Sequence, residues 1–349
     1  MEGLITMERV LVTGGTGFVA GWCVADLLGR GYEVRTTVRD PKNEPGVRAA
    51  AGDGPLEVVR ADLTRDEGWD AAVDGCAYVL HVASPLSLDG RAGDEALIGP
   101  ARDGALRVLG AATRAGVKRV VLTSSTAATT PRDPHGVSDE TVWTDPADPN
   151  LNPYRRSKLL AERAAWDFMA LDGRGTELTT VLPAAVFGPL RSPGNAGSVD
   201  VIARLLAGRP PVLPRFGFSI VDVRDLADLH IRAMTNPAAA GERFIGAGEF
   251  QWLAEMAATL RTHLGDRARK VPTRGVPDGL VRTLARVVPP LRTLTPLLGR
   301  DLTFSSAKAQ RLLGFTPRPA TTTIVDCAET LLAGCSTRRV AGSRGNRLR

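Results

Sequence analysis

The chain has 349 residues, of which 43% are hydrophobic and 23% are charged, as is usual for a soluble globular protein. This length accommodates one large α/β domain with a smaller second lobe. No apolar run reaches the roughly 20 residues that a membrane-spanning helix requires, and no charged-then-apolar signal pattern opens the chain. The predicted location is therefore cytoplasmic, without a membrane partner.

The net charge of +6 and the isoelectric point near 9.5 raise the question of a nucleic-acid partner. Residues 336–349 contain five arginines and no acid, which leaves a net charge of about +1 on the rest of the chain. We interpret this segment as a disordered, solubilising tail, with no nucleic-acid partner. The four cysteines and four histidines show no ligand spacing, so no metal site is predicted.

Short runs rich in valine and leucine alternate with helical patterns along the first half of the chain. Predicted strands cover residues 9–13, 33–38, 56–60, 78–82, 119–123 and 178–182. Predicted helices cover residues 19–30, 101–115 and the segment around 154–162, and residues 220–230 resemble a strand edge that leads into a helix. Buried strands that alternate with helices predict an α/β fold with a doubly wound parallel sheet of the Rossmann type.

A glycine turn joins the first predicted strand to the first predicted helix. The free N–H groups and partial positive charge of a helix N-terminus stabilise a phosphate, and glycine permits its close approach. Gly14 and Gly17 occupy two of the small positions and Ala20 the third, with the spacing Gly-x-x-Gly-x-x-Ala. Strand, turn and helix in this order predict a site for the pyrophosphate of a dinucleotide.

The dinucleotide-binding domain is predicted to cover residues 1–185, with residues 217–247 returning to it. Residues 186–216 and 248–335 are predicted to form a smaller, discontinuous lobe over the reactive end of the cofactor, where a substrate would lie. Several aromatic residues could line an apolar pocket there or belong to the core: Trp143, Phe187, Phe216, Phe218 and Trp252.

The residues that follow the second strand predict which dinucleotide binds. A carboxylate there accepts hydrogen bonds from the adenine ribose of NAD, whereas an arginine pairs with the 2′-phosphate of NADP. Arg39 and Lys42 favour NADP(H), although they could be solvated loop charges, and Asp40 would permit NAD if it turned inward. Asp62, after the third strand, fits either a contact to adenine or the cap of a following helix.

Tyr154 and Lys158 lie four residues apart on a predicted helix, so their side chains share one face. A free tyrosine has a pKa of about 10, and an ammonium group nearby would bring that pKa toward neutrality. The pair therefore predicts proton transfer by Tyr154, with Lys158 as its electrostatic support. Glu162, one turn further along, could be a plain surface charge.

Hydroxyl residues follow the fifth predicted strand directly, in the sequence Thr-Ser-Ser-Thr at 123–126. A hydroxyl at the carboxyl end of a central strand can hold a substrate oxygen beside the cofactor. Ser125 is the preferred donor and Ser124 the alternative. Either could instead satisfy backbone groups within the turn.

A set of motifs covers residues 8–235 in the order and spacing of a known family. They are VTGGTGFVAG at 12–21, TVRDP at 37–41, ADL at 61–63, HVASP at 81–85, VKRVVLTSS at 117–125, YRRSKLLAE at 154–162 and VDVRDLADLH at 221–230. Taken together, they resemble an extended short-chain dehydrogenase/reductase. The resemblance is strongest to the branch of dihydroflavonol 4-reductases, cinnamoyl-CoA reductases and aldehyde reductases.

This resemblance implies that Ser125, Tyr154 and Lys158 are catalytic, and that Lys158 also binds the nicotinamide ribose. It implies cofactor contacts from Gly14, Thr16, Gly17, Phe18, Val19, Arg39, Asp62, Leu63, Ala83, Tyr154, Lys158, Pro183 and Val186. The chain departs from the family pattern at Ala20. Arg107 lies near the position of an asparagine that relays protons in some relatives, so water is expected to serve that route.

The predicted function is NADPH-dependent reduction of an aldehyde or ketone. Ser125 would hold the carbonyl, nicotinamide C4 would supply hydride, and Tyr154 would supply the proton. The predicted partner is a small-molecule carbonyl substrate, whose identity stays open, and the chain is expected to be a monomer or homodimer.

The alternatives are an NAD-retaining sugar-nucleotide epimerase or dehydratase, an enzyme resembling 3β-hydroxysteroid dehydrogenase, and a non-catalytic NADP-sensing regulator. Arg39 argues against the first of these. The presence of both Tyr154 and Lys158 argues against the last.

Overall fold

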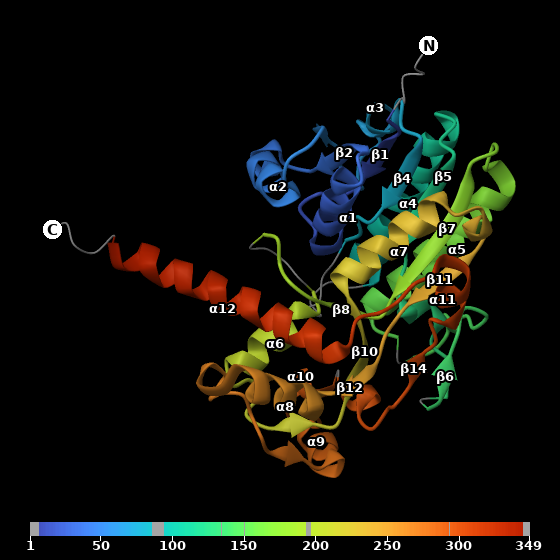
Figure 1. The fold of residues 1–349 in the computed structure, drawn as a ribbon. Helices are drawn as coiled ribbons and strands as arrows, with labels where there is room; N and C mark the ends of the chain where they lie inside the picture. The colour runs from blue at the N-terminus through green and yellow to red at the C-terminus, as the bar shows by residue number, and fades with distance from the viewer. Residues whose placement is uncertain are drawn as a thin grey trace.

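In the part of the chain that the computed structural model describes, seven strands pair in parallel into one sheet, in the order β11-β7-β5-β4-β1-β2-β3 (Figure 1). The described residues are 7–85, 94–133, 135–149, 151–192, 197–292 and 294–344. The strands are β1 (Arg9–Val12), β2 (Glu33–Val38), β3 (Leu56–Arg60), β4 (Tyr78–His81), β5 (Arg119–Thr123), β7 (Glu177–Pro183) and β11 (Arg243–Gly246). The predicted doubly wound parallel sheet is confirmed.

Helices cover both faces of this sheet. Val10 and Val12 pack on one face and Leu11 on the other, because successive side chains of a strand point in opposite directions. The first face carries α1 (Phe18–Gly29), α2 (Glu44–Ala51), α7 (Val223–Thr235) and α11 (Ala307–Leu313); the second carries α3 (Trp69–Val73), α4 (Asp94–Arg114) and α5 (Pro153–Asp172). Burial on both faces explains the uninterrupted apolar runs of β1, β4 and β5.

A smaller lobe contains a separate sheet whose described strands are β8 (Ala185–Phe187), β10 (Gly217–Asp222) and β12 (Phe250–Trp252). β10 pairs in parallel with β8 and antiparallel with β12. Phe187 is fully buried in the core of this lobe, and its ring contacts that of Phe218 edge-on. The other described elements are β6 (Val137–Ser138), α6 (Val199–Leu206), β9 (Leu213–Pro214), α8 (Leu253–Leu264), β13 (Gly275–Val276), α9 (Asp278–Leu284), α10 (Pro289–Arg292), β14 (Thr303–Phe304) and α12 (Ala320–Arg344).

The predicted boundaries differ most from the structure in three places. Because β10 pairs with β8 and β12, the chain returns to the main sheet through α7 and β11, and not from residue 217. α4 begins at Asp94 rather than at residue 101, with Pro100 inside the helix. The prediction of a disordered tail is wrong for residues 336–344, because α12 continues to Arg344.

The helix α12 begins against the core of the lobe. Ile324, Cys327 and Ala328 are fully buried there, which fixes the first turns of the helix and lets it extend outward (Figure 1). Residues 345–349 of the predicted tail lie outside the described residues.

No helix within the described ranges is long and apolar enough to cross a bilayer. Over the same ranges, no three histidine, cysteine or acidic side chains lie close enough together to hold a metal ion.

Candidate active site

A cavity of about 670 Å³ lies at the carboxyl ends of the parallel strands. It lies where the strand order reverses, because β1 pairs with β2 on one side and with β4 on the other. The predicted site residues that line it are Gly14, Thr16, Gly17, Phe18, Val19, Arg39, Asp62, Leu63, Ala83, Ser125, Tyr154, Lys158, Pro183 and Val186. Lys42 is exposed and is not among the described residues that line it.

The glycine turn is held against neighbouring strands by its backbone. Gly14 has φ +76°, and its N–H donates to Thr37 Oγ1 at 2.9 Å. A Cβ at Gly14 would lie 2.9 Å from the Cβ of Ala83. Gly17 caps α1 without a side-chain hydrogen bond, and the first turn contains no acid. The first N–H groups of α1 therefore present an uncompensated positive end to the cavity.

The hydroxyl of Thr13 joins the turn after β1 to the end of β4. It accepts a hydrogen bond from the N–H of Ala83 at 2.9 Å and contacts Nδ1 of His81 at 2.9 Å. Burial and the charge of Lys158 lower the pKa of His81 to about 3, so the imidazole is neutral at ordinary pH.

The charged residues that follow β2, Arg39 and Asp40, differ in what they contact. Arg39 is exposed at the edge of the cavity, whereas the carboxylate of Asp40 accepts from the N–H of Lys42 at 3.0 Å and caps a short helical turn. Asp62 accepts from both the N–H and the hydroxyl of Thr64 at 2.9 Å. These bonds lower the pKa of Asp62, and Arg39 adds to the effect.

The two serines after β5 face different partners. The hydroxyl of Ser124 donates to Oε2 of Glu162 at 2.5 Å and is buried. Ser125 lines the cavity, where its side chain shares a hydrogen bond with Tyr154 and accepts from the N–H of Ala127 at 3.2 Å. Both serines line the cavity, but the hydroxyl proton of Ser124 is used in the bond to Glu162. Ser125 is therefore the better placed of the two to donate to a ligand.

Tyr154 and Lys158 both face the cavity from α5, and burial shifts both toward their neutral forms. The ammonium of Lys158 donates to the carbonyl of Thr123 at 3.1 Å. Burial lowers the pKa of Lys158 to about 8, and Glu162 opposes that shift. Burial raises the pKa of Tyr154, and its hydrogen bond with Ser125 opposes that shift. The prediction of a pKa near neutrality for Tyr154 is thus wrong for this structure, because desolvation of the phenol is the largest cause and raises its pKa.

The structure corrects the interpretation of Glu162 and shows what Arg107 contacts. Glu162 is not a surface charge, because it is only 1% exposed and forms an ion pair with Arg243. Arg107 pairs with Asp66 and donates to the carbonyl of Leu63 at 2.9 Å. It therefore supports the loop that carries Leu63.

Some cavity residues were missed in the sequence. Thr37 and Asn43 flank Arg39 on the chain, and their proximity to it was the available signal. Leu97 and Pro100 were missed because α4 was expected to begin after them. The aromatic residues considered for a pocket do not line this cavity: Trp143, Phe187, Phe216, Phe218 and Trp252.

The turn geometry predicts opposite effects of alanine at two glycines. Gly14→Ala should destabilise the protein by about 2–4 kcal/mol, because it adds left-handed strain and a close contact with Ala83. Gly21→Ala should be neutral or stabilising by up to about 1 kcal/mol, because it lies within α1 where a Cβ meets nothing within 4 Å. Urea unfolding of the two variants measures both; equal stability of the two would contradict this account of the turn.

Comparison with known proteins agrees with this geometry. The family model described as "NAD dependent epimerase/dehydratase family" matches residues 10–246. The chain is 40% identical to cinnamoyl-CoA reductase CAD2 of Medicago truncatula, over 66% of this chain and 74% of that protein. It is 36% identical to an anthocyanidin reductase of Vitis vinifera, over 77% of this chain and 84% of that protein.

Solved structures of reductases have the same fold. The yeast methylglyoxal/isovaleraldehyde reductase Gre2 complexed with NADPH superposes with a TM-score of 0.79 and 25% identity, over 94% of this chain and 99% of that chain. Gre2 of Candida albicans with NADPH superposes with a TM-score of 0.79 and 27% identity, over 93% and 99% of the two chains. The resemblance to extended short-chain dehydrogenases/reductases is confirmed, and the chain belongs to the NAD-dependent epimerase/dehydratase family.

Proposed function

We propose that this chain is an NADPH-dependent reductase of an aldehyde or ketone. The observation that carries the proposal is the grouping of Ser125, Tyr154 and Lys158 in the same cavity as the glycine turn. The enzyme class, an oxidoreductase acting on carbonyl groups, and the cofactor NADP(H) agree with the cinnamoyl-CoA and anthocyanidin reductases among its relatives and with the NADPH complexes of Gre2.

The cavity fits a dinucleotide phosphate on its own geometry. A Cβ would fill the space beside Gly14, and the first turn of α1 presents donors that no side chain caps. In this proposal the pyrophosphate would be held by the glycine turn and the start of α1, at Gly14, Thr16, Gly17, Phe18 and Val19. Arg39 would bind the 2′-phosphate, and Asp62 and Leu63 would contact the adenine. The nicotinamide end would lie against Ala83, Tyr154, Lys158, Pro183 and Val186. When bound, the cofactor supplies the hydride.

The side chains supply position and a proton. Ser125 donates a hydrogen bond to the substrate carbonyl oxygen, and Tyr154 transfers its proton to that oxygen as hydride reaches the carbon. The raised pKa of Tyr154 keeps the phenol protonated until then. Lys158, whose ammonium lies in the same cavity, stabilises the phenolate that remains.

Replacement of Tyr154 tests the proton donor. Tyr154→Phe should lower kcat/KM for carbonyl reduction about 10²–10⁴-fold, because the proton donor is lost. Its affinity for NADPH, followed by fluorescence titration, should stay close to that of the wild type. Tyr32→Phe, which changes a tyrosine at the start of β2, is the matched control and should keep full activity. Normal turnover by Tyr154→Phe would refute the assignment.

The preference for NADPH should depend on Arg39. Arg39→Ala should raise the KM for NADPH about tenfold to a hundredfold and leave the KM for NADH unchanged, because only NADPH carries the 2′-phosphate. Lys42→Ala removes a neighbouring cation that does not line the cavity, and it should have little effect. Steady-state kinetics with both cofactors compare the variants, and an equal effect of the two substitutions would contradict the role given to Arg39.

The reaction itself is tested by following the absorbance of NADPH with aromatic aldehydes, β-keto esters and bulky ketones. The proposal expects net consumption of NADPH with at least one of these classes. Copurified NAD, with no net consumption on any carbonyl, would instead favour a sugar-nucleotide epimerase or dehydratase.

A further inference from the structure

Glu162 is a buried acid one helical turn beyond Lys158. Its carboxylate accepts hydrogen bonds from Ser124 Oγ at 2.5 Å and from Thr180 Oγ1 at 2.9 Å. The guanidinium of Arg243 reaches both of its oxygens, with Nε at 2.8 Å from Oε1 and Nη2 at 3.4 Å from Oε2. These donors compensate the carboxylate for the water that burial removes.

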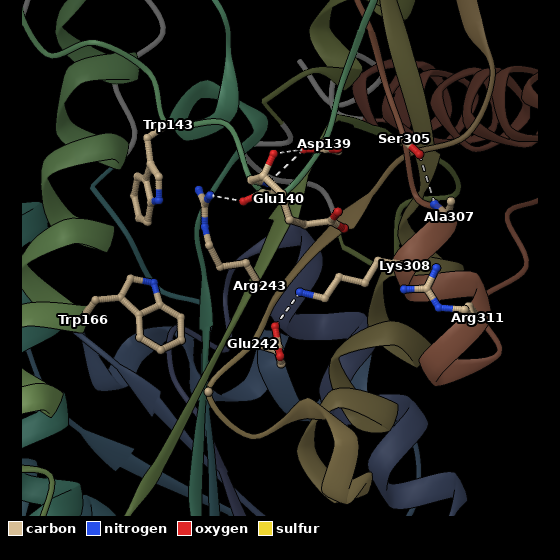
Figure 2. A pocket seen from close by; sticks show the side chains of 12 residues that line it. Asp139, Glu140, Trp143, Trp166, Glu242, Arg243, Ser305, Ala307, Lys308 and Arg311 are labelled. Carbon is tan, nitrogen blue, oxygen red and sulfur yellow. Dashed lines mark hydrogen bonds and ion pairs between the residues drawn. The ribbon is translucent and has the colours of Figure 1, made fainter.

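Arg243 is itself fixed from the opposite side. Its Nη1 donates to the carbonyls of Glu140 at 2.6 Å and Val142 at 3.1 Å, and its guanidinium lies 3.7 Å from the ring centre of Trp143. Figure 2 shows this guanidinium beside Trp143 and Glu140, at a second cavity of about 610 Å³. The position of Arg243 is therefore set by contacts that do not involve Glu162, and Arg243 can act as a clamp on that carboxylate.

The clamped carboxylate connects the two segments that carry the reacting side chains. Ser124 precedes Ser125, and its N–H donates to the carbonyl of Val181 at 2.8 Å. Lys158 donates to the carbonyl of Thr123, so the loop 123–125 contacts α5 both through Lys158 and through Glu162. Loss of the carboxylate would remove the connection through Ser124 and leave those through Lys158 and through the hydrogen bond between Ser125 and Tyr154.

Glu162 also supplies the negative charge that acts on Lys158. From β4, His81 faces Lys158 and is neutral, because burial and Lys158 itself lower its pKa to about 3. His230, which contacts the hydroxyl of Thr123 from α7, is also neutral, with a pKa lowered to about 4 by burial. Tyr154 is an uncharged phenol below its raised pKa, and Arg243 is the counter-ion of Glu162 on the far side.

We propose that Glu162, clamped by Arg243, is a positioning residue that holds the loop of Ser125 against α5 and serves as the counter-charge of Lys158. The inference rests on the proposed reductase function, which gives Ser125, Tyr154 and Lys158 their roles. In this inference, Glu162 influences both the positions of Ser125, Tyr154 and Lys158 and the pH range in which they act.

The pH dependence has a definite sign. Glu162 raises the pKa of Lys158, so removal of its charge lets Lys158 lose its proton at a lower pH. The fall of kcat/KM at high pH, which we call the alkaline limb of the profile, should then move to lower pH, because Lys158 supports proton transfer only while it is charged. The two neutral histidines do not titrate in that range, so they do not produce the limb.

The test compares the variant Glu162→Gln with the variant Glu177→Gln, which changes the acid of another arginine–glutamate ion pair at the same sheet. Glu177 binds buried Arg119, whose Nη1 also donates to backbone carbonyls at the end of α7. Glu162→Gln should lower kcat about tenfold to a hundredfold and shift the alkaline limb to lower pH. NADPH affinity should change by no more than about twofold. Glu177→Gln should match the wild type in rate and pH profile.

Two more variants separate charge from folding. Glu162→Asp keeps the charge and should keep the wild-type limb even if its rate falls. Glu162→Gln with Arg243→Met removes both buried charges, so no unpaired arginine opposes folding, and it should show the same shifted limb. A folded Glu162→Gln or double variant with a wild-type limb and rate overturns the inference. A wild type that reduces no carbonyl with NADPH overturns the proposed function, and with it this inference.

Discussion

Hydrogen bonds from the turn after β1 to strand β2 and to the end of β4 shape the cavity at the edge of the sheet. β1 pairs with β2 on one side and with β4 on the other, so its carboxyl end lies between two diverging connections. The N–H of Gly14 binds the hydroxyl of Thr37, and the hydroxyl of Thr13 binds both His81 and the N–H of Ala83. These bonds fix the glycine turn within the protein itself, which reduces the conformational entropy lost when a ligand binds.

Burial controls the electrostatics of this cavity more strongly than any single pair of charges. It lowers the pKa of Lys158 to about 8 and that of His81 to about 3, and it raises that of Tyr154. A phenol that keeps its proton and a lysine that titrates near neutrality suit the transfer of one proton to a carbonyl oxygen. At the buried carboxylate of Glu162, hydrogen bonds and Arg243 replace the water that the group lost on folding.

The family match ends at residue 246, where β11 completes the main sheet. The chain then forms β12 and α8, whose buried Leu253 and Met256 join Phe187 in the core of the lobe. The match therefore covers the main sheet and the residues proposed to bind the cofactor and to transfer the proton, while the core of the lobe is largely built from residues outside the match. A lobe of separate construction is consistent with one reaction being applied to different carbonyl compounds among related enzymes.

The sequence by itself determined the features that depend on neighbouring residues. The strands at 33–38, 56–60 and 119–123, the glycine turn and the shared helix face of Tyr154 and Lys158 follow from local pattern and period. Only the tertiary structure decided that Ser124 donates to Glu162, that Asp40 caps a turn, that Glu162 is buried against Arg243, and that burial raises the pKa of Tyr154. Each of these depends on desolvation or on a partner far away in the chain, and neither leaves a periodic signal in the sequence.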